Sequence, residues 1–436
     1  MVYGGYDGTH APNQNRQGYS HFNGESWLNV NFDPNNPTND LVHVTIDEEA
    51  ENRVFISSYG DTNQVNTSLT GGLFEIVDDE IRTFQNSLNS PLEDIVPDNP
   101  NRVTVRIGNT IFDDEGNLWV TNVQAEERLK RFSASGVWTS FDINSLLTIN
   151  AGTIGFMDIA IDNRNTKWMA TRGNGVLAFN ENGERGQVLT PEVNRGNLPN
   201  ANVQSLAIDD SNNVWIGTIN GLVVFFGAGN IFDAETFNAE PIIISQDGNA
   251  ERLLGDQNVR TIAVDGANNK WFGTDGGGVL NTNPNGQTTL ANFSTNNSPL
   301  PSNTILKISI DDSTGKVFFV TDRGMVAFNS NVAPFGNELT DVYAYPNPVL
   351  KNHDTVTING RNGASLPENT NVKILDVAGN LVYETNVVEG EQLQGGKVVW
   401  DKRNLAGRKV ASGVYIVLLA TSDGLESTTT KIAIIN

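Results

Sequence analysis

Short stretches of alternating apolar and polar residues, separated by turn residues, recur along most of the chain. Residues 203–208 alternate up to an Asp, a cluster of Asp and Asn follows, and VWIGT (214–218) and GLVVF (221–225) come next. A period of two predicts β-strands, and Asp, Asn and Gly clusters predict turns, because these residues tolerate left-handed backbone and bond their own backbone. No segment shows an extended 3.6-residue period, so the pattern predicts an all-β protein.

This unit is repeated along the chain. Clear copies are IFDDEGNLWVT (111–121), IAIDNRNTKWMAT (159–171), LAIDDSNNVWIGT (206–218) and IAVDGANNKWFGT (262–274), with weaker copies at 46–57 and 308–321. Each carries an aromatic anchor, and successive anchors lie 47 to 64 residues apart: Phe55, Trp119, Trp168, Trp215, Trp271 and Phe318. Three or four short strands per repeat predict the blades of a β-propeller, with the anchors in the layers between blades.

The number of blades depends on how the N-terminal segment is interpreted. Tyr3 lies 52 residues before Phe55 and supplies a seventh anchor, which favours seven blades over six. No innermost strand precedes Tyr3, so we expect residue 1 to lie inside an incomplete first blade of a longer protein. Alternatively, SWLNVNF (26–32) is the outer strand that closes the last of six blades.

The last hundred residues follow a different pattern. Seven short alternating segments, from VYAY (342–345) to TTTKIAII (428–435), are separated by turn signals such as AGN (378–380) and SDG (422–424). Such a succession of short strands predicts an immunoglobulin-like β-sandwich. We therefore expect a propeller over residues 1–335 and a sandwich domain over residues 336–436.

The amino-acid composition argues against several classes of partner and site. The 436 residues include 51 acidic and 28 basic ones, for a net charge of −23, of which residues 337–436 contribute 11 acidic and 9 basic. An acidic chain argues against nucleic acid as a partner and against unaided binding to an anionic membrane. No apolar run reaches the 18 or so residues of a membrane span, and Met1–Gly5 lack the features of a signal peptide. The absence of Cys excludes disulfides, thiolate metal ligands and a Cys nucleophile.

Catalytic and metal-binding motifs are scarce. The four histidines (His10, His21, His43 and His353) have no zinc-type spacing, and there is no GxSxG. The segment DDEGNLW (113–119) allows a calcium loop, a sialidase-type Asp-box or a plain turn in which Asp caps the backbone, and the plain turn is favoured. We therefore expect no metal, no cofactor and no catalytic residues.

The remaining candidate is a binding face. The turns after the aromatic strands should converge at one end of the propeller channel, where they would present Tyr59, Asn122, Arg172, Asn174, Asn220, Asp275, Asp322 and Arg323. Arg and Asn suit charged sugars, because guanidinium pairs with carboxylate or phosphate. The alternative is that these are ordinary polar loop residues. The long insertion at 57–105 is either a further binding element or a solvated loop packed at the rim.

Two family resemblances rest on longer motifs. LPSNTILKISIDD (300–312) and VWIGTINGL (214–222) resemble the two-component-regulator propeller repeat. The tail resembles the C-terminal sorting domain of the type IX secretion system of Bacteroidetes, the alternative being a generic immunoglobulin-like spacer. The residues that carry this resemblance, and through which it implies sorting and docking, are Tyr345, Pro346, Asn347, Pro348, Asp376, Gly379, Gly407, Ser412, Gly413, Tyr415 and Lys431.

The combination of propeller and tail resembles surface components of that secretion machinery. The resemblance implies export through the periplasm to the outer surface of the outer membrane, where such a protein keeps its tail. It also implies partners among the outer-membrane and sortase components, and binding of the glycan of anionic lipopolysaccharide. We therefore predict a non-catalytic scaffold of the attachment (sortase) complex. The alternatives are a secreted cargo protein, such as an adhesin or glycan-binding propeller, and a glycan-active propeller enzyme, which the lack of an assignable carboxylate pair disfavours.

Overall fold

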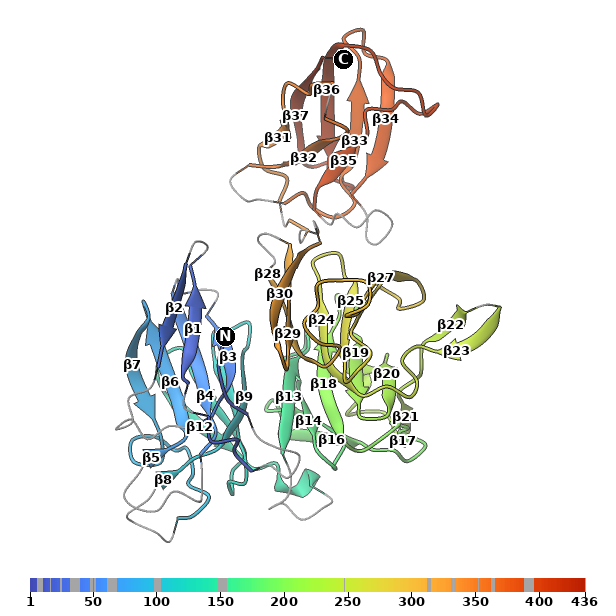
Figure 1. Cartoon of the computed structure of the whole chain (residues 1–436). Coiled ribbons are helices and arrows are strands. Elements are labelled where there is room, and N and C mark those ends of the chain that lie inside the picture. The colour runs from blue at the N-terminus through green and yellow to red at the C-terminus, as the bar shows by residue number, and fades with distance from the viewer. Residues whose placement is uncertain are drawn as a thin grey trace. The chain divides into compact units, whose positions relative to one another are not determined.

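The protein is built from β-strands. The computed structural model describes residues 1–5, 11–15, 17–23, 26–31, 40–47, 50, 52–60, 69–97, 103–147, 155–246, 248–311, 315–330, 332, 335–336, 338–351, 353–361, 365–387 and 396–435. Two one-turn 3₁₀ helices, Asn144–Leu146 and Ala228–Asn230, accompany the strands in this part of the chain (Figure 1). The all-β prediction is confirmed: a β-propeller is followed by an immunoglobulin-like sandwich.

The chain forms two compact units. The first comprises Met1–Pro241 and Leu254–Val259, and the second comprises Ile242–Leu253 and Arg260–Asn436. The expected boundary between residues 335 and 336 and the number of blades stay predictions.

The first unit contains four sheets whose strands follow one another in chain order. They are β3 (Leu41–Ile46), β4 (Arg53–Ser58), β6 (Gly72–Val77) and β7 (Glu80–Gln85); β9 (Ile107–Phe112), β10 (Leu118–Asn122), β11 (Leu129–Phe132) and β12 (Trp138–Phe141); β13 (Phe156–Ile161), β14 (Lys167–Thr171), β15 (Val176–Asn180) and β16 (Arg185–Leu189); and β18 (Val203–Ile208), β19 (Val214–Thr218) and β20 (Gly221–Phe225). Two-stranded pairs complete the unit: β1 (Tyr19–Phe22) with β2 (Trp27–Val30), β5 (Leu69–Thr70) with β8 (Val103–Thr104), and β17 (Arg195–Gly196) with β21 (Phe237–Asn238).

The second unit continues the same pattern. Its blade-type sheets are β24 (Val259–Val264), β25 (Lys270–Thr274), β26 (Val279–Thr282) and β27 (Thr289–Phe293), then β28 (Ile305–Asp311), β29 (Lys316–Thr321) and β30 (Gly324–Asn329). The hairpin of β22 (Ile243–Gln246) and β23 (Asn249–Arg252) also belongs to this unit, whereas the first residue of β24 belongs to the other.

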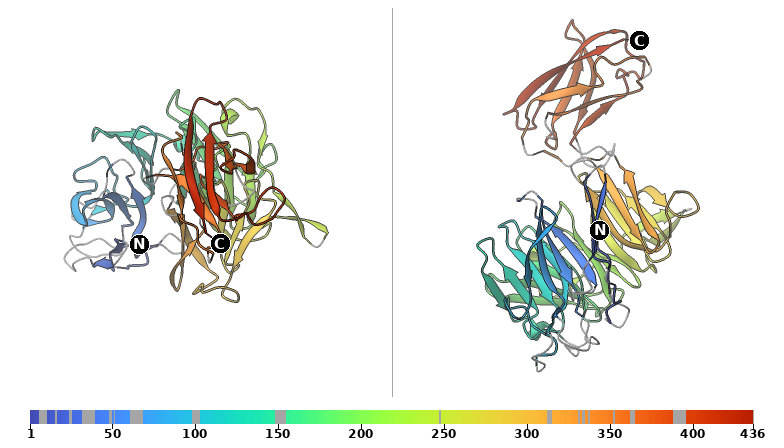
Figure 2. Two further views of the ribbon diagram at one scale, coloured as in Figure 1. Left: turned by 90° about the horizontal axis from the view of Figure 1, so that it is seen from above. Right: turned by 60° about the vertical axis from the view of Figure 1, so that its left-hand side comes forward.

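The C-terminal part of the second unit is the sandwich. One sheet has the order β31 (Val342–Tyr345), β32 (Val356–Gly360), β35 (Val398–Trp400); the other has the order β34 (Leu381–Asn386), β33 (Asn371–Leu375), β36 (Gly413–Ala420), β37 (Ser427–Ile434). These orange-to-red strands gather into one compact body (Figure 2). Its core includes Val356, Ile358, Val372, Trp400 and Val417, which come from both sheets and are all fully buried.

A pinned turn explains the six-residue spacing between Asp and Trp. Asp113 Oδ1 accepts the backbone N–H groups of Glu115 (3.1 Å) and Asn117 (2.9 Å), and Asp113 Oδ2 accepts the indole N–H of Trp119 (2.8 Å). The same indole bond joins three more pairs: Trp168 to Asp162 (3.0 Å), Trp215 to Asp209 (2.8 Å) and Trp271 to Asp265 (2.9 Å). The acidic segments are therefore the backbone-capping turns that the pattern predicts, with an added bond that locks the tryptophan.

Several aromatic anchors lie between neighbouring sheets, as predicted, but in the copy at 308–321 Phe319 is the buried residue of such a cluster and the predicted Phe318 is only half-buried. Trp119 on β10 packs with Ile159 and Met169 of the next sheet. Trp168 on β14 packs with Leu206 and Ile216 of the sheet after that. A β-sheet that is apolar on both faces cannot bury them alone, so Trp119 and Trp168 each join their own blade to the next.

Candidate functional site

Three of the eight predicted propeller-loop residues are buried. Tyr59, Asn122 and Asn174 expose 2% or less of their surface. The Arg106 guanidinium carbon lies 4.7 Å from the centre of the Tyr59 ring. The Asn122 amide accepts the Glu93 N–H (2.7 Å) and donates to the Glu93 carbonyl (3.3 Å), and the Asn174 amide donates to the Leu146 carbonyl (3.2 Å). The structure therefore gives these three side chains a structural role in place of the ligand contact that the sequence predicts.

The other five residues lie in turns that reach the surface. In the first unit, Arg172 is half-buried beside Asn174 in one turn and Asn220 is exposed in another. In the second unit, the consecutive residues Asp322 and Arg323 are exposed. Asp275 forms an ion pair with Arg260, with 3.5 Å between Oδ2 of Asp275 and Nη1 of Arg260. The Asp275 carboxylate also accepts the Thr304 hydroxyl (3.2 Å). Asp275 is thus charge-paired, whereas Arg172, Asn220, Asp322 and Arg323 remain accessible for a ligand.

These turns share a backbone design. Thr171 Oγ1 donates to the Gly175 carbonyl (2.8 Å) and accepts the Asn174 N–H (3.1 Å). Gly175 has a φ of +74°, and a Cβ there would lie 1.9 Å from the Leu189 carbonyl oxygen. Only glycine fits this position, because a side chain would collide with the outer strand.

Within residues 57–105, which the sequence predicts to be an insertion, the structure describes residues 57–60, 69–97 and 103–105. Here the prediction is wrong for residues 72–85, because β6 pairs with β4 and β7 pairs with β6, which completes a four-stranded sheet. The segment that follows β7 is anchored by buried Leu92 and by the Asn122 bonds to Glu93. A pocket of about 440 Å³ lies beside it and is lined by Pro91, Glu93, Glu126, Glu127, Asp142 and Asn144. The Glu93 carboxylate accepts the Lys130 ammonium (2.8 Å) and the Glu127 N–H (3.0 Å), so its charge is already compensated from within the protein.

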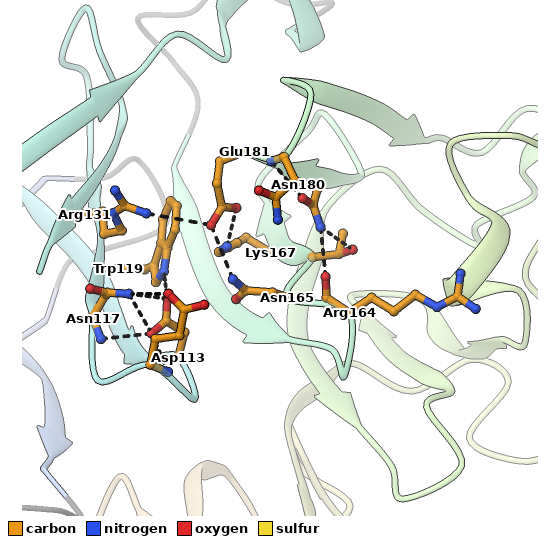
Figure 3. A network of polar contacts seen from close by, with 12 residues as sticks. Asp113, Asn117, Trp119, Arg131, Arg164, Asn165, Lys167, Asn180 and Glu181 are labelled. Carbon is orange, nitrogen blue, oxygen red and sulfur yellow. Dashed lines mark hydrogen bonds and ion pairs between the residues drawn. The ribbon is translucent and has the colours of Figure 1, made fainter.

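A buried polar network connects the second and third four-stranded sheets (Figure 3). The Lys167 ammonium is fully buried, lies 3.8 Å from the centre of the Trp119 ring and donates to Glu181 Oε2 (2.5 Å). Burial lowers the pKa of Lys167, and the bond to Glu181 opposes this shift. The sequence carries one signal for such a lysine, which is its place directly before Trp in the copies at 168 and 271.

The pKa of Asp113, the aspartate of the pinned turn in this network, is also shifted. Burial alone would raise the pKa of Asp113, but the hydrogen bonds from Trp119, Asn117 and Glu115 outweigh it, and the pKa is lowered. Within the described ranges, no three His, Asp or Glu side chains are grouped as a metal site. In the same part of the chain, no helix is long and apolar enough to cross a membrane.

The sorting-type residues of the tail are mostly turn and anchoring residues. The Asn347 amide donates to the Lys431 carbonyl (2.8 Å) and accepts the Ala433 N–H (3.0 Å), which ties the YPNP segment to β37. Pro346 and Pro348 both follow cis peptide bonds, and Tyr345 and Lys431 are exposed.

A second group of tail residues shapes the turns around β33 and β36. The Asp376 carboxylate accepts hydrogen bonds from the side-chain amide and the backbone N–H of Asn380, and these bonds lower the pKa of Asp376. Gly379 and Gly407 have φ of +84° and +72°. The Tyr415 hydroxyl donates to the Ala411 carbonyl (2.8 Å), next to Ser412 and Gly413. Burial, together with the Asp376 charge, raises the pKa of Tyr415.

Comparison with known families defines the class. Residues 343–436 match the model of the secretion system C-terminal sorting domain, and residues 197–220 match the two component regulator propeller. The chain therefore combines regulator-propeller repeats with a sorting tail, and such a tail implies export to the cell surface. No curated protein matches the sequence.

Among solved structures, the chain is PorZ-like. It matches PorZ of Porphyromonas gingivalis, an essential bacterial surface component of the type IX secretion system, with 26% identity and a TM-score of 0.62 over 96% of this chain and 55% of that chain. It thus spans about half the length of PorZ. Weaker matches are the extracellular domain of BT3049 of B. thetaiotaomicron (14% identity, TM-score 0.36, 91% of this chain and 55% of that chain) and YCF48 bound to D1 peptide (12%, 0.44, 70% and 83%). The sorting tail and the PorZ likeness together connect this chain with type IX secretion.

Proposed function

We propose that this chain is a non-catalytic surface scaffold of the type IX attachment (sortase) complex. The observation that carries the proposal is the PorZ match, which covers 96% of this chain and so includes both its propeller and its tail. In this proposal residues 1–335 form the propeller that contacts protein partners and glycan, and residues 336–436 form the docking tail. The protein reaches the outer face of the outer membrane through the periplasm and stays there.

The fate of the tail separates this proposal from its main rival. A machinery component uses its tail for docking and keeps it, whereas exported cargo uses the tail only as an address. Mass-spectrometric mapping of the C-terminus of the protein from intact cells is expected to recover peptides that include Ile434 and Ile435. A cut between residues 337 and 345, with a modified new terminus, would identify cargo and contradict the scaffold proposal.

The proposed glycan contact is tested at an accessible turn arginine. Arg323 is exposed and follows Asp322 in the turn after β29, and a guanidinium can pair with phosphate or carboxylate groups of anionic lipopolysaccharide. We expect Arg323→Ala to weaken binding of purified anionic lipopolysaccharide about tenfold, because charge-assisted hydrogen bonds contribute roughly 1.5–3 kcal/mol. Arg185→Ala is the matched control, since Arg185 is an exposed arginine on β16 that pairs with Asp233 in a turn. Equal affinities of both variants and the parent protein, measured by calorimetry, would remove this turn from the glycan site.

The same preparation tests the third candidate, a glycan-active enzyme. A scaffold is expected to leave a panel of surface polysaccharides intact, as judged by released reducing ends. Turnover of any of them would revive the enzyme hypothesis.

A further inference from the structure

The edges of the four-stranded sheet in the tail are occupied at several positions. On the β34 edge, the Leu405 N–H donates to the Val382 carbonyl (2.9 Å). On the β37 edge, the Val349 N–H donates to the Ala433 carbonyl (2.7 Å), and the Ile435 N–H donates to the Val349 carbonyl (2.8 Å). Docking of a partner strand needs a run of free backbone groups, so these bonds disfavour it at both edges.

The outer face of the same sheet is unusually apolar. The inward-facing residues of β36 are Tyr415, Val417 and Leu419, which are buried, so Val414, Ile416 and Leu418 lie on the opposite face. The register aligns Leu381, Leu375 and Ile416 across β34, β33 and β36. We call these residues and their exposed neighbours the apolar stripe: Leu375, Val377, Leu381, Leu405, Val414, Ile416 and Leu418. Several members are strongly exposed, with 76% for Val377, 64% for Leu405 and 45% for Val414.

A sandwich of this kind needs only one apolar face per sheet, and the other normally carries polar residues. The opposite end of the same outer face follows that rule, with Asn371, Asn386 and Ser427. A contiguous apolar area on a secreted domain costs solubility and is typical of an interaction site.

The border of the stripe is basic. Arg403, Arg408 and Lys409 are exposed around Leu405, and Lys431 is exposed on β37 next to Ile416. Lys402 in the same segment as Leu405 is buried and Arg403 pairs with Asp401 (3.2 Å), so Arg408, Lys409 and Lys431 supply most of the positive charge of the border. A partner that fits this border carries carboxylates around an apolar centre.

We propose that the tail docks through this apolar stripe onto a protein of the type IX machinery whose matching surface is apolar with an acidic border. The inference rests on the proposed function and names the surface that performs the docking. A protein fits better than an anionic bilayer, because the Lys373–Glu384 ion pair (3.5 Å) lies within this face. A bilayer would have to bury the Glu384 charge or repel it, whereas a protein partner can leave that pair at the edge of the contact.

The test uses the full-length protein in its own type IX-competent cells. Leu418→Asp places a charge on β36 at the edge of the stripe, beside Lys373 and two residues from Ile416. Ser427→Asp is the matched control, because Ser427 lies on the same outer face at its polar end. We expect Leu418→Asp to lower the amount of protein held on the cell surface about tenfold and to release intact protein with its tail into the medium. Ser427→Asp should behave like the parent protein, and Leu381→Asp should reproduce the loss from another strand.

Three readouts separate the outcomes. Unchanged thermal unfolding of the released Leu418→Asp protein shows that docking, and not folding, was lost. If Leu418→Asp is fully retained on the surface with an intact tail, the stripe is not the docking surface, but the scaffold proposal stands. If the tail of the parent protein is removed, the scaffold proposal itself is contradicted. A membrane could instead be the partner. If the parent protein binds vesicles of anionic phospholipid and Leu418→Asp abolishes that binding, the partner is a membrane and the inference is overturned.

Discussion

Replacing Trp168 with alanine is expected to lower the free energy of unfolding by about 3–5 kcal/mol. The Trp168 side chain is fully buried between its own sheet and the next, where it packs with Leu206 and Ile216. Its removal leaves a cavity between two blades and also removes the indole N–H that Asp162 Oδ2 accepts at 3.0 Å. Urea unfolding followed by circular dichroism measures the loss.

Two variants make this prediction specific. Trp168→Phe keeps most of the apolar packing but loses the indole bond, so we expect a smaller loss, about 1–3 kcal/mol. Trp27→Ala is the matched control, because Trp27 on β2 is 47% exposed, and a substitution there should cost far less. Equal losses for Trp168→Ala and Trp27→Ala would show that the tryptophans between blades do not carry the stability of the propeller.

Replacing Glu181 with glutamine is expected to destabilise the protein by about 3–5 kcal/mol, because it leaves the buried Lys167 charge without its counterion. Lys167 is completely buried, and its ammonium nitrogen lies 3.8 Å from the centre of the Trp119 ring. Glu184→Gln is the matched control, since Glu184 is exposed on the same turn. Chemical denaturation at about pH 7 compares the two variants, and similar stabilities would contradict the role assigned to the ion pair.

The pH dependence of this variant follows from the lowered pKa of Lys167. The unfolded chain, with its lysines near the usual pKa of about 10.4, holds a proton at pH values where the folded chain releases it. Stability therefore rises with pH in the interval between the two pKa values. Glu181→Gln removes the group that supports the charged form, so the deficit of the variant should narrow as the pH rises toward 10. A deficit that widens instead would mean that Lys167 is not the group responsible.

A further variant tests the buried charge directly. Lys167→Met, which removes the charge at similar volume, should lower the free energy of unfolding less than Glu181→Gln does at neutral pH.

Most strands and turns and the class of fold are predictable from local sequence patterns, although β6 and β7 lie in a segment that these patterns assign to an insertion. Alternation within 203–208 and the Asp209-to-Trp215 spacing depend on contacts between residues a few positions apart, so both can be read from a single copy. The sorting motif from Tyr345 to Pro348 is likewise a local pattern, and the family match at 343–436 confirms its interpretation.

The tertiary structure decided which polar residues are accessible. Asn122 is the last residue of one strand and Asn220 lies just after another. Asn122 is buried and bonded to Glu93, 29 residues away in the chain, while Asn220 stays exposed. The burial of Lys167 likewise depends on a distant residue, because Trp119, 48 residues earlier in the chain, packs against its ammonium group. The apolar stripe appears only when β33, β34 and β36 are aligned in one sheet. Backbone periodicity and turn chemistry are set by near neighbours along the chain, whereas burial, ion pairing and surface patches arise from side chains that only the packing of distant segments brings together.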